Sequence, residues 1–578
     1  MLLEAVKMQV ETRLESSLHN RVYIIPDKDK NPSQVEHPWN IDVKSGYKPK
    51  FRLPKNTHII KVFDQSGVEG RLLILGKPGA GKTTMLLELA KVLVQRAEQD
   101  LSEPVPILLS LSSWQNDQQS IADWIVEELN SGKSYKIRKY IAKQWLEEGE
   151  IIPLLDGLDE LAALRQERCV QKLNQFLLPG NWSYPLVVCS RIEEYQLYST
   201  QLALNTSVEL QPFTEEKIQD YLRGTGNEKL WNSINNEQEL RELAQTPFLL
   251  NIIVISCQKL SLEKWQKLKS LEERVNYLLS AYVEEMLARS YQGKRPSNEK
   301  TKQWLCWLAL KMIDQNETEF FIEKMQPHCL KNNTQKRLFH FNVVLIVLLV
   351  FGLISERIHG LNVGIISAFL AGFIASLRTK RITPFESLTF SLQKLRYKLV
   401  MGLIFGLIGG LFVLLPGLLR NELQYGFGIQ GGLITGSCVG LLSFLILGFS
   451  GCEITIRTKP NHGIKNSAQN AIIFSLIGSV VFGLTFVLLR LLKGQTAEPI
   501  VAILTGLING VWVGMLGGSF PCIQHFILRL ILYCNGHIPW NYASFLEYAT
   551  DRLFLQRLGG GYRFIHDLLR QHFADNYR

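Results

Sequence analysis

At 578 residues the chain is longer than one hydrophobic core can organise, so it must form several domains. Its apolar fraction of 46% averages two unlike parts: residues 1–337 are mixed and charged, whereas residues 338–520 are mostly Leu, Ile, Val, Phe and Gly. The net charge of +10 lies largely between the apolar stretches and in the tail, which favours a membrane surface over nucleic acid as a partner. The nine cysteines are scattered and form no C-x-x-C pair, which weighs against a zinc site or a disulfide framework.

The first segment, residues 1–54, opens with MLLEAVKMQVETRLESS. Charged residues stand where a signal peptide needs an apolar core, so the pattern predicts an amphipathic helix followed by loop. We therefore expect the first half of the protein to stay in the cytoplasm.

Residues 71–94, RLLILGKPGAGKTTMLLELAKVLV, predict a buried strand, a glycine-rich turn and a helix. The turn matches G-x-x-x-x-G-K-[ST], in which backbone N–H groups surround phosphate oxygens at the positive end of the helix. Lys82 would reach the β- and γ-phosphates, and the Thr83 hydroxyl would bind Mg²⁺. The predicted phosphate site comprises Gly76, Lys77, Pro78, Gly79, Ala80, Gly81, Lys82, Thr83 and Thr84.

A second predicted strand, in EIIPLLDGLDEL (150–161), ends in acidic residues. Asp156 at its end is placed to hold Mg²⁺ through water. Asp159 and Glu160 follow within one turn, and they are candidates for polarising an attacking water.

A third predicted strand, PLVVCSR (185–191), ends at Arg191. An arginine at the end of a strand beside the phosphate loop can respond to a γ-phosphate. Three strands that end in phosphate chemistry, separated by helices, predict a doubly wound parallel sheet, the α/β fold of a P-loop NTPase. We place this core at residues 55–213.

These motifs, together with LAQTPFLLNIIV (243–254), resemble the NACHT domain of the STAND class of signalling NTPases over residues 55–330. The resemblance implies ATP/ADP and Mg²⁺ as ligands, hydrolysis through Asp159 and Glu160, and a proline packed on adenine. Only the proline of the family's G-x-P motif is present, as Pro247 in Gln245-Thr246-Pro247. Pro247 could equally serve only to start the next helix.

The tail GGGYRFIHDLLRQHFA is similar to the end of the winged-helix domain in the same family. The resemblance implies that His566 contacts the β-phosphate of ADP, whereas an ordinary polar role near a helix start is the alternative. We predict a small helical domain at 214–270 that opens at Thr214, a winged-helix domain that begins at 271–337, and its completion within 521–578.

Residues 338–520 contain six apolar stretches of roughly bilayer-spanning length, at 339–355, 361–377, 399–419, 426–449, 470–490 and 499–520. Twelve Lys and Arg residues lie in the connections on one side and four on the other, which predicts a multi-pass, bacterial-type inner-membrane protein with both termini in the cytoplasm. Repeated small residues at four-residue spacing, such as Gly506/Gly510/Gly514, predict close helix packing.

The combination favours a membrane-anchored switch that exchanges ADP for ATP, opens and forms homo-oligomers, with slow ATP hydrolysis as the reset. An ATP-driven transporter, a pore-forming effector and a scaffold with structural nucleotide remain alternatives. Family membership suggests a role in stress, cell death or defence against phage. The sequence leaves open the triggering ligand or partner and the choice between ATP and GTP.

Overall fold

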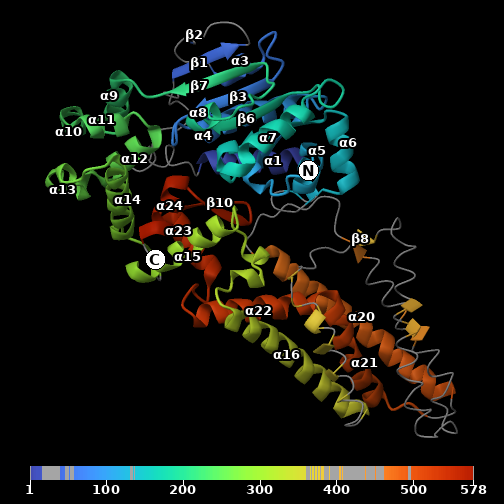
Figure 1. Cartoon of the computed structure of the whole chain (residues 1–578). Helices are drawn as coiled ribbons and strands as arrows, with labels where there is room; N and C mark the ends of the chain where they lie inside the picture. The colour runs from blue at the N-terminus through green and yellow to red at the C-terminus, as the bar shows by residue number, and fades with distance from the viewer. Residues whose placement is uncertain are drawn as a thin grey trace. The chain divides into compact units, whose positions relative to one another are not determined.

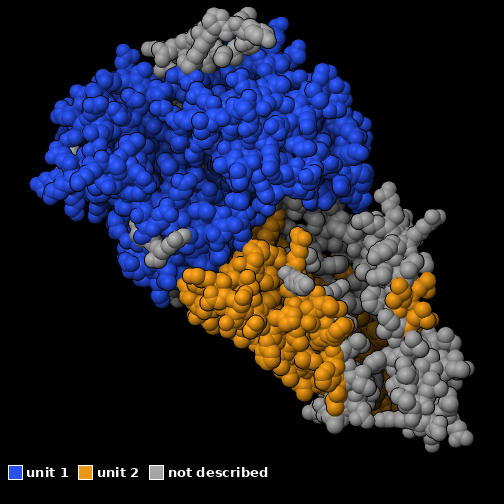
Figure 2. Space-filling view, viewed as in Figure 1, with its two compact units in different colours: residues 1–320, 454–459, 541–578 blue, residues 321–453, 460–540 orange. Residues whose placement is uncertain are grey.

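The computed structural model describes residues 2–15, 40–45, 51–52, 58–130, 135, 137–293, 295–359, 461–492 and 496–576, with isolated positions between 365 and 450. The chain divides into two compact units (Figure 2). Unit 1 comprises residues 1–320, 454–459 and 541–578, and unit 2 comprises residues 321–453 and 460–540. The C-terminal segment therefore rejoins the unit that contains the predicted NTPase core.

Unit 1 is built on a seven-stranded sheet with the order β2-β1-β7-β3-β6-β5-β4. Five neighbouring strands are parallel, as an α/β P-loop fold requires: β3 (Arg71–Gly76), β4 (Val105–Ser110), β5 (Ile151–Asp156), β6 (Leu186–Arg191) and β7 (Thr206–Gln211). Strands β3, β5 and β6 are the three predicted ones, and they are buried because nearly every side chain in them is apolar. Strand β6 separates the phosphate-loop strand from the acidic strand.

Two strands at one edge of the sheet come from the N-terminal segment, where the sequence predicted only loop. Strand β1 (Asn40–Ser45) pairs antiparallel with β7 and with the short β2 (Phe51–Arg52). Residues 1–54 thus contribute a helix, α1 (Leu2–Glu15), and part of the sheet.

Helices surround the sheet (Figure 1). Helix α4 (Lys82–Gln99) follows the phosphate loop, and its buried face carries Met85, Leu86, Leu89 and Leu93 at helical spacing. The other helices of the core are α3 (Ile59–Phe63), α5 (Ile121–Asn130), α6 (Lys139–Glu147), α7 (Ala163–Phe176) and α8 (Ile192–Gln196).

A run of helices follows the sheet. Its first helix is capped by Thr214, whose side chain accepts a hydrogen bond from the Lys217 N–H. The run comprises α9 (Glu215–Gly224), α10 (Leu230–Asn236), α11 (Gln238–Ala244), α12 (Pro247–Ser256), α13 (Leu262–Gln266), α14 (Leu271–Ala288) and α15 (Asn298–Asp314).

The C-terminal segment packs against this run. It forms α23 (Tyr542–Asp551), a hairpin of β10 (Leu555–Leu558) and β11 (Gly561–Phe564), and α24 (Asp567–Asn576). The buried Tyr282 hydroxyl of α14 donates to the Leu553 carbonyl at 2.7 Å, and Phe320 and Tyr562 exchange two backbone hydrogen bonds. Two chain segments separated by more than two hundred residues therefore share one packed module within unit 1.

In unit 2 the described helices are α16 (Asn333–His359), α20 (His462–Leu492), α21 (Pro499–Gly514) and α22 (Phe520–Cys534). Helices α20 and α21 run side by side, with Gly506, Gly510 and Gly514 on the contact face. A Cβ at Gly506 would lie 2.3 Å from the Ser479 carbonyl oxygen of α20. The predicted close packing through small residues is confirmed for this ladder.

By length and composition, one described helix can cross a membrane by itself: residues 463–488 of α20 have a mean hydropathy of 2.5. Helices α11 and α12 would pass only as one span, but they meet at a bend of 118°. The predicted stretch 339–355 lies within α16, and the stretches 361–377, 399–419 and 426–449 lie outside the described residues apart from isolated positions. The described part of the chain therefore does not support a bundle of six spans.

The last predicted span, 499–520, is interrupted. Helix α21 has 16 residues and ends at Gly514, before a π-helical turn at Met515–Ser519. Gly518 in that turn has φ 144°, a value that suits glycine and that breaks a continuous helix. The apolar composition that suggested one span is shared by α21 and the start of α22.

Candidate functional site

The phosphate loop between β3 and α4 has the backbone that its glycines allow. Gly79 and Gly81 have φ of 76° and 97°, which side chains with a Cβ rarely adopt. The Lys82 ammonium donates to the carbonyl oxygens of Gly76 and Lys77, at 2.9 and 3.2 Å. The loop thus surrounds its own lysine, at the start of an 18-residue helix whose positive end attracts anions.

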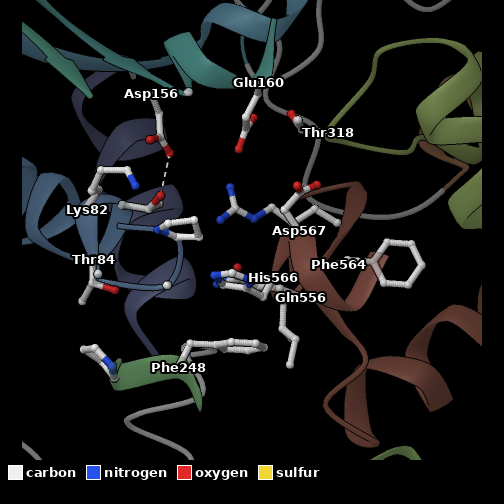
Figure 3. Close-up of a pocket in the computed structure, with 18 of the residues that line it drawn as sticks. Lys82, Thr84, Asp156, Glu160, Phe248, Thr318, Gln556, Phe564, His566 and Asp567 are labelled. Carbon is white, nitrogen blue, oxygen red and sulfur yellow. Dashed lines mark hydrogen bonds between the residues drawn. The ribbon is translucent and has the colours of Figure 1, made fainter. Parts of the chain in front are cut away.

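The predicted magnesium ligands lie next to one another. The Thr83 hydroxyl donates to the Asp156 carboxylate, with Oγ1 and Oδ2 2.9 Å apart (Figure 3). A hydroxyl and a carboxylate at hydrogen-bond distance are hard oxygen ligands of the kind Mg²⁺ prefers, and both border the same cavity. The donor set therefore fits a magnesium ion, which Thr83 and Asp156 would hold and which would neutralise phosphate charge.

Asp159 and Glu160 follow Asp156 but face different neighbours. The Asp159 carboxylate accepts from the Arg191 backbone N–H at 2.9 Å and pairs with the Arg191 Nε at 2.8 Å. Glu160 instead points into the cavity (Figure 3). Gly157, with φ 79°, allows this turn, since a Cβ there would lie 2.7 Å from a Glu160 carboxylate oxygen.

Charge and burial perturb the pKa values of both acids. Desolvation by burial raises the Asp159 pKa, although Lys82 and Arg191 oppose it. Desolvation, together with the charges of Asp156, Asp159 and Asp567, raises the Glu160 pKa to about 8. A carboxylate whose pKa lies near neutral pH is suited to accept a proton from water.

Arg191 joins two parts of the chain. Besides Asp159, its guanidinium pairs with Glu194 at 3.3 Å and with Asp567 of α24 at 3.4 Å. Asp567 in turn pairs with Arg570 on its own helix. The predicted sensor arginine thus connects the acidic strand end to the C-terminal segment.

His566 lies at the phosphate loop, immediately before α24. Its ring stacks on Phe248 with centroids 3.8 Å apart, and its Nε2 lies 3.5 Å from the position of a Cβ on Gly79. Desolvation by burial lowers the His566 pKa to about 3, with Lys82, Arg191 and Arg563 adding to the effect, so the ring is neutral. Because Nδ1 accepts from the Leu568 N–H at 3.1 Å, the proton of the neutral ring is assigned to Nε2, which can donate.

Together these groups enclose a cavity of about 200 Å³. Every predicted site residue borders it except Gly76, the last residue of β3, and Lys77 and Ala80 of the loop. Phe213, Tyr221 and Phe248 supply apolar surface that a base could contact, and Pro247 is the first residue of α12.

The sequence did not single out several other residues that border the cavity: Arg13, Leu87, Gly157, Phe213, Tyr221, Phe248, Asn251, Thr318, Gln556, Arg563, Asp567 and Arg570. Arg563 and Asp567 lie within three residues of His566 in the sequence, so this proximity could have suggested them. Nothing in the pattern around Arg13 or Gln556 points to a distant cavity.

A parallel sheet with its glycine-rich loop, acidic strand end and neighbouring arginine at one edge defines a P-loop NTPase. Residues 71–229 match the family model of the NACHT domain, so this part of the chain is a NACHT domain. The fold and the match together imply that the site binds a nucleotide.

Comparison with solved structures finds the crystal structure of Cdc6p from Pyrobaculum aerophilum, at 16% identity over 43% of this chain and 70% of that one, with a TM-score of 0.23. The Aeropyrum pernix ORC1 protein in complex with DNA is 12% identical over 44% of this chain and 69% of that one, with a TM-score of 0.22. Among curated proteins, no match to the chain was found.

Proposed function

We propose that the protein is a membrane-attached ATP/ADP switch of the STAND class, in which the C-terminal segment closes the nucleotide site of the NACHT domain. The observation that carries the proposal is the position of His566 and Asp567. They come from a segment far from the NACHT domain in sequence, yet they border the same cavity as Lys82, Asp156 and Arg191. In this proposal, the nucleotide bound and the position of this segment depend on each other.

The closed arrangement suits a diphosphate. His566 can donate from Nε2 toward the phosphate loop, and Arg191 is held between Asp159 and Asp567. A γ-phosphate adds negative charge beside Arg191 and competes with Asp567 for the guanidinium. Losing that ion pair loosens α24, so ATP favours an open form through differential contacts.

The module that opens is a winged-helix domain in this proposal. Helices α14, α15 and α23 with the β10–β11 hairpin supply the helices and the wing, and α24 follows the wing. The membrane segment is inserted between its two parts. Open subunits expose the surface that α24 covered, and we propose that they associate into homo-oligomers before slow hydrolysis resets them.

The proposal is tested by the rate at which ADP leaves the full-length protein in mild detergent. We expect ADP to copurify, and His566→Ala to release it about tenfold faster, because one hydrogen bond to a charged group is worth about that factor. The matched control is Asp575→Ala, an exposed residue at the far end of the same helix. Equal ADP release from His566→Ala and from the unaltered protein would contradict the closing role.

Membrane attachment is supported by the surface of unit 2. Large apolar side chains of α20 are exposed, among them Ile472, Leu476, Val480 and Leu484 at helical spacing, each about 60% accessible or more. At the start of α16, Lys336, Arg337 and His340 line a shallow cavity next to apolar surface, the placement expected at a cytoplasmic membrane interface.

We expect the expressed full chain to sediment with membranes and to resist extraction by alkaline carbonate, since the exposed apolar stripe of α20 is costly in water. Leu476→Asp combined with Val480→Asp, which places two charges on that stripe, should release a measurable fraction of the protein. Replacing the exposed Lys465 at the start of α20 with Gln is the control. Release of the unaltered chain by carbonate would overturn the proposed membrane attachment.

A further inference from the structure

The N-terminal helix α1 ends at the nucleotide cavity, although it lies well before the NACHT domain in sequence. Its buried residues Leu2, Ala5, Val6 and Val10 belong to the same hydrophobic core as the strands of the sheet. Lys7 pairs with Glu98 of α4 at 2.7 Å on the surface. Helix α1 is thus anchored along its length to the NTPase core, and its last turn carries Arg13 to the site.

Arg13 is held in place by both its backbone and its side chain. Its carbonyl oxygen accepts a hydrogen bond from the Gln556 Nε2 of β10, at 2.7 Å. Its side chain borders the cavity, is about 6% exposed, and lies with Nη2 4.0 Å from the Asp156 Oδ2. Burial lowers the pKa of the guanidinium to about 10, so it is charged at neutral pH.

The charges around Asp156 indicate what this cation can bind. Asp156 is also the candidate Mg²⁺ ligand, through its contact with Thr83. Two carboxylates, Glu319 and Asp156, stabilise the charge of Arg13, while Arg563 opposes it. If a divalent cation were bound at Asp156, part of that carboxylate's negative charge would be used by the metal, and a phosphate beside Arg13 would restore it. The oxygens of a metal-bound phosphate supply that anion, and a guanidinium binds them in a planar, two-donor geometry.

We propose that Arg13 is a phosphate-binding residue supplied from outside the NACHT domain, which contacts the Mg²⁺-bound terminal phosphate of a nucleoside triphosphate. The inference rests on the proposed nucleotide switch and adds to it a role for the N-terminal helix. Because coupling between two bound elements is reciprocal, a triphosphate that gains affinity from Arg13 also stabilises α1 on the core. The stability of α1 on the core then depends on which nucleotide is bound.

The test compares the full-length protein with Arg13→Ala and with Lys7→Ala, which removes the surface ion pair of the same helix. Dissociation constants for Mg²⁺·ATP and Mg²⁺·ADP are measured on each preparation, and their ratio does not depend on the folded fraction. We expect Arg13→Ala to weaken ATP binding about tenfold or more and ADP binding by less than threefold. Lys7→Ala should leave the ratio unchanged, and Arg13→Lys should recover part of the ATP affinity.

A second readout follows α1 directly. With Mg²⁺·ATP bound, hydrogen exchange of residues 2–15 should be slower in the unaltered protein than in Arg13→Ala, and with Mg²⁺·ADP bound the two should differ much less. If Arg13→Ala left the ratio of the ATP and ADP dissociation constants unchanged, the inference would be overturned. An equal loss of both affinities would show that Arg13 has a structural role only. If the unaltered protein bound neither nucleotide, the proposed function itself would fail.

Discussion

Lys82→Ala is expected to lower nucleotide affinity by about a hundredfold or more and to remove copurifying nucleotide. The Lys82 ammonium already donates to two carbonyl oxygens of the phosphate loop, so it is preorganised at the place where the β- and γ-phosphates would lie. Two lost hydrogen bonds to charged oxygens account for that factor. Isothermal titration with ATP and ADP, in the presence of Mg²⁺, measures the change.

The control for this variant is Lys91→Ala. Lys91 is exposed on the same helix, α4, and does not border the cavity. The substitution therefore removes an equal charge without changing the site. Both variants should show the same thermal unfolding temperature within about 1–2 °C, as expected of exposed or partly exposed positions. Full nucleotide affinity in Lys82→Ala would refute the assignment of the phosphate site.

The second large effect is expected for Glu160→Gln, which should slow ATP hydrolysis by a factor of about 10²–10⁴ while ATP remains bound. The two acids after Asp156 are not equivalent. Asp159 forms an ion pair and a hydrogen bond with Arg191, whereas Glu160 points into the cavity. We therefore assign water activation to Glu160 and the orientation of Arg191 to Asp159. Single-turnover hydrolysis separates the chemical step from nucleotide release.

Glu160→Gln also has an expected signature in stability. The pKa of Glu160 is raised in the folded protein, to about 8 from an ordinary 4.5, so the folded state binds a proton that the unfolded state has released. The native protein thus loses stability as pH rises from about 4.5 to about 8, and Gln removes that loss. The unfolding temperature of Glu160→Gln should exceed that of the unaltered protein at pH 8, and the difference should shrink toward pH 5.

Glu193→Gln serves as the control for both measurements, since Glu193 is exposed on α8 and does not border the cavity. It should match the unaltered protein in hydrolysis and in the pH dependence of unfolding. If Glu160→Gln left the single-turnover rate of ATP hydrolysis unchanged, Glu160 would not activate the water, and Asp159 would be the remaining candidate. A stability difference that grows toward low pH would contradict the raised pKa.

Much of the NTPase site could be predicted because its parts are short and local. The loop from Gly76 to Thr83 encodes its own geometry, through glycines that allow positive φ and a helix that begins at Lys82. Asp156 and Arg191 each end an apolar strand, and the ends of parallel strands meet at one edge of the sheet. The sequence of the tail likewise indicated a strand and a helix on either side of His566.

Strand β1 and the π-helical break after Gly514 were not predictable in the same way. Strand β1 exists because β7 offers it a partner, and pairing of distant segments leaves little trace in composition. The break at Gly518 depends on local backbone conformation, whereas apolar composition continues across it. Composition therefore overestimated the length of a single apolar helix.

The amino-acid sequence by itself determined the class of site, because each of its motifs is contiguous and carries its own backbone preference. Only the tertiary structure decided which distant residues complete the cavity: Arg13 from α1, Phe248 from α12, and Gln556 and Asp567 from the C-terminal segment. These contacts arise when separate apolar faces are buried together, and the polar groups at their edges then meet across hundreds of residues. No local pattern records such a meeting, since the energy that produces it comes from the burial of the surrounding core.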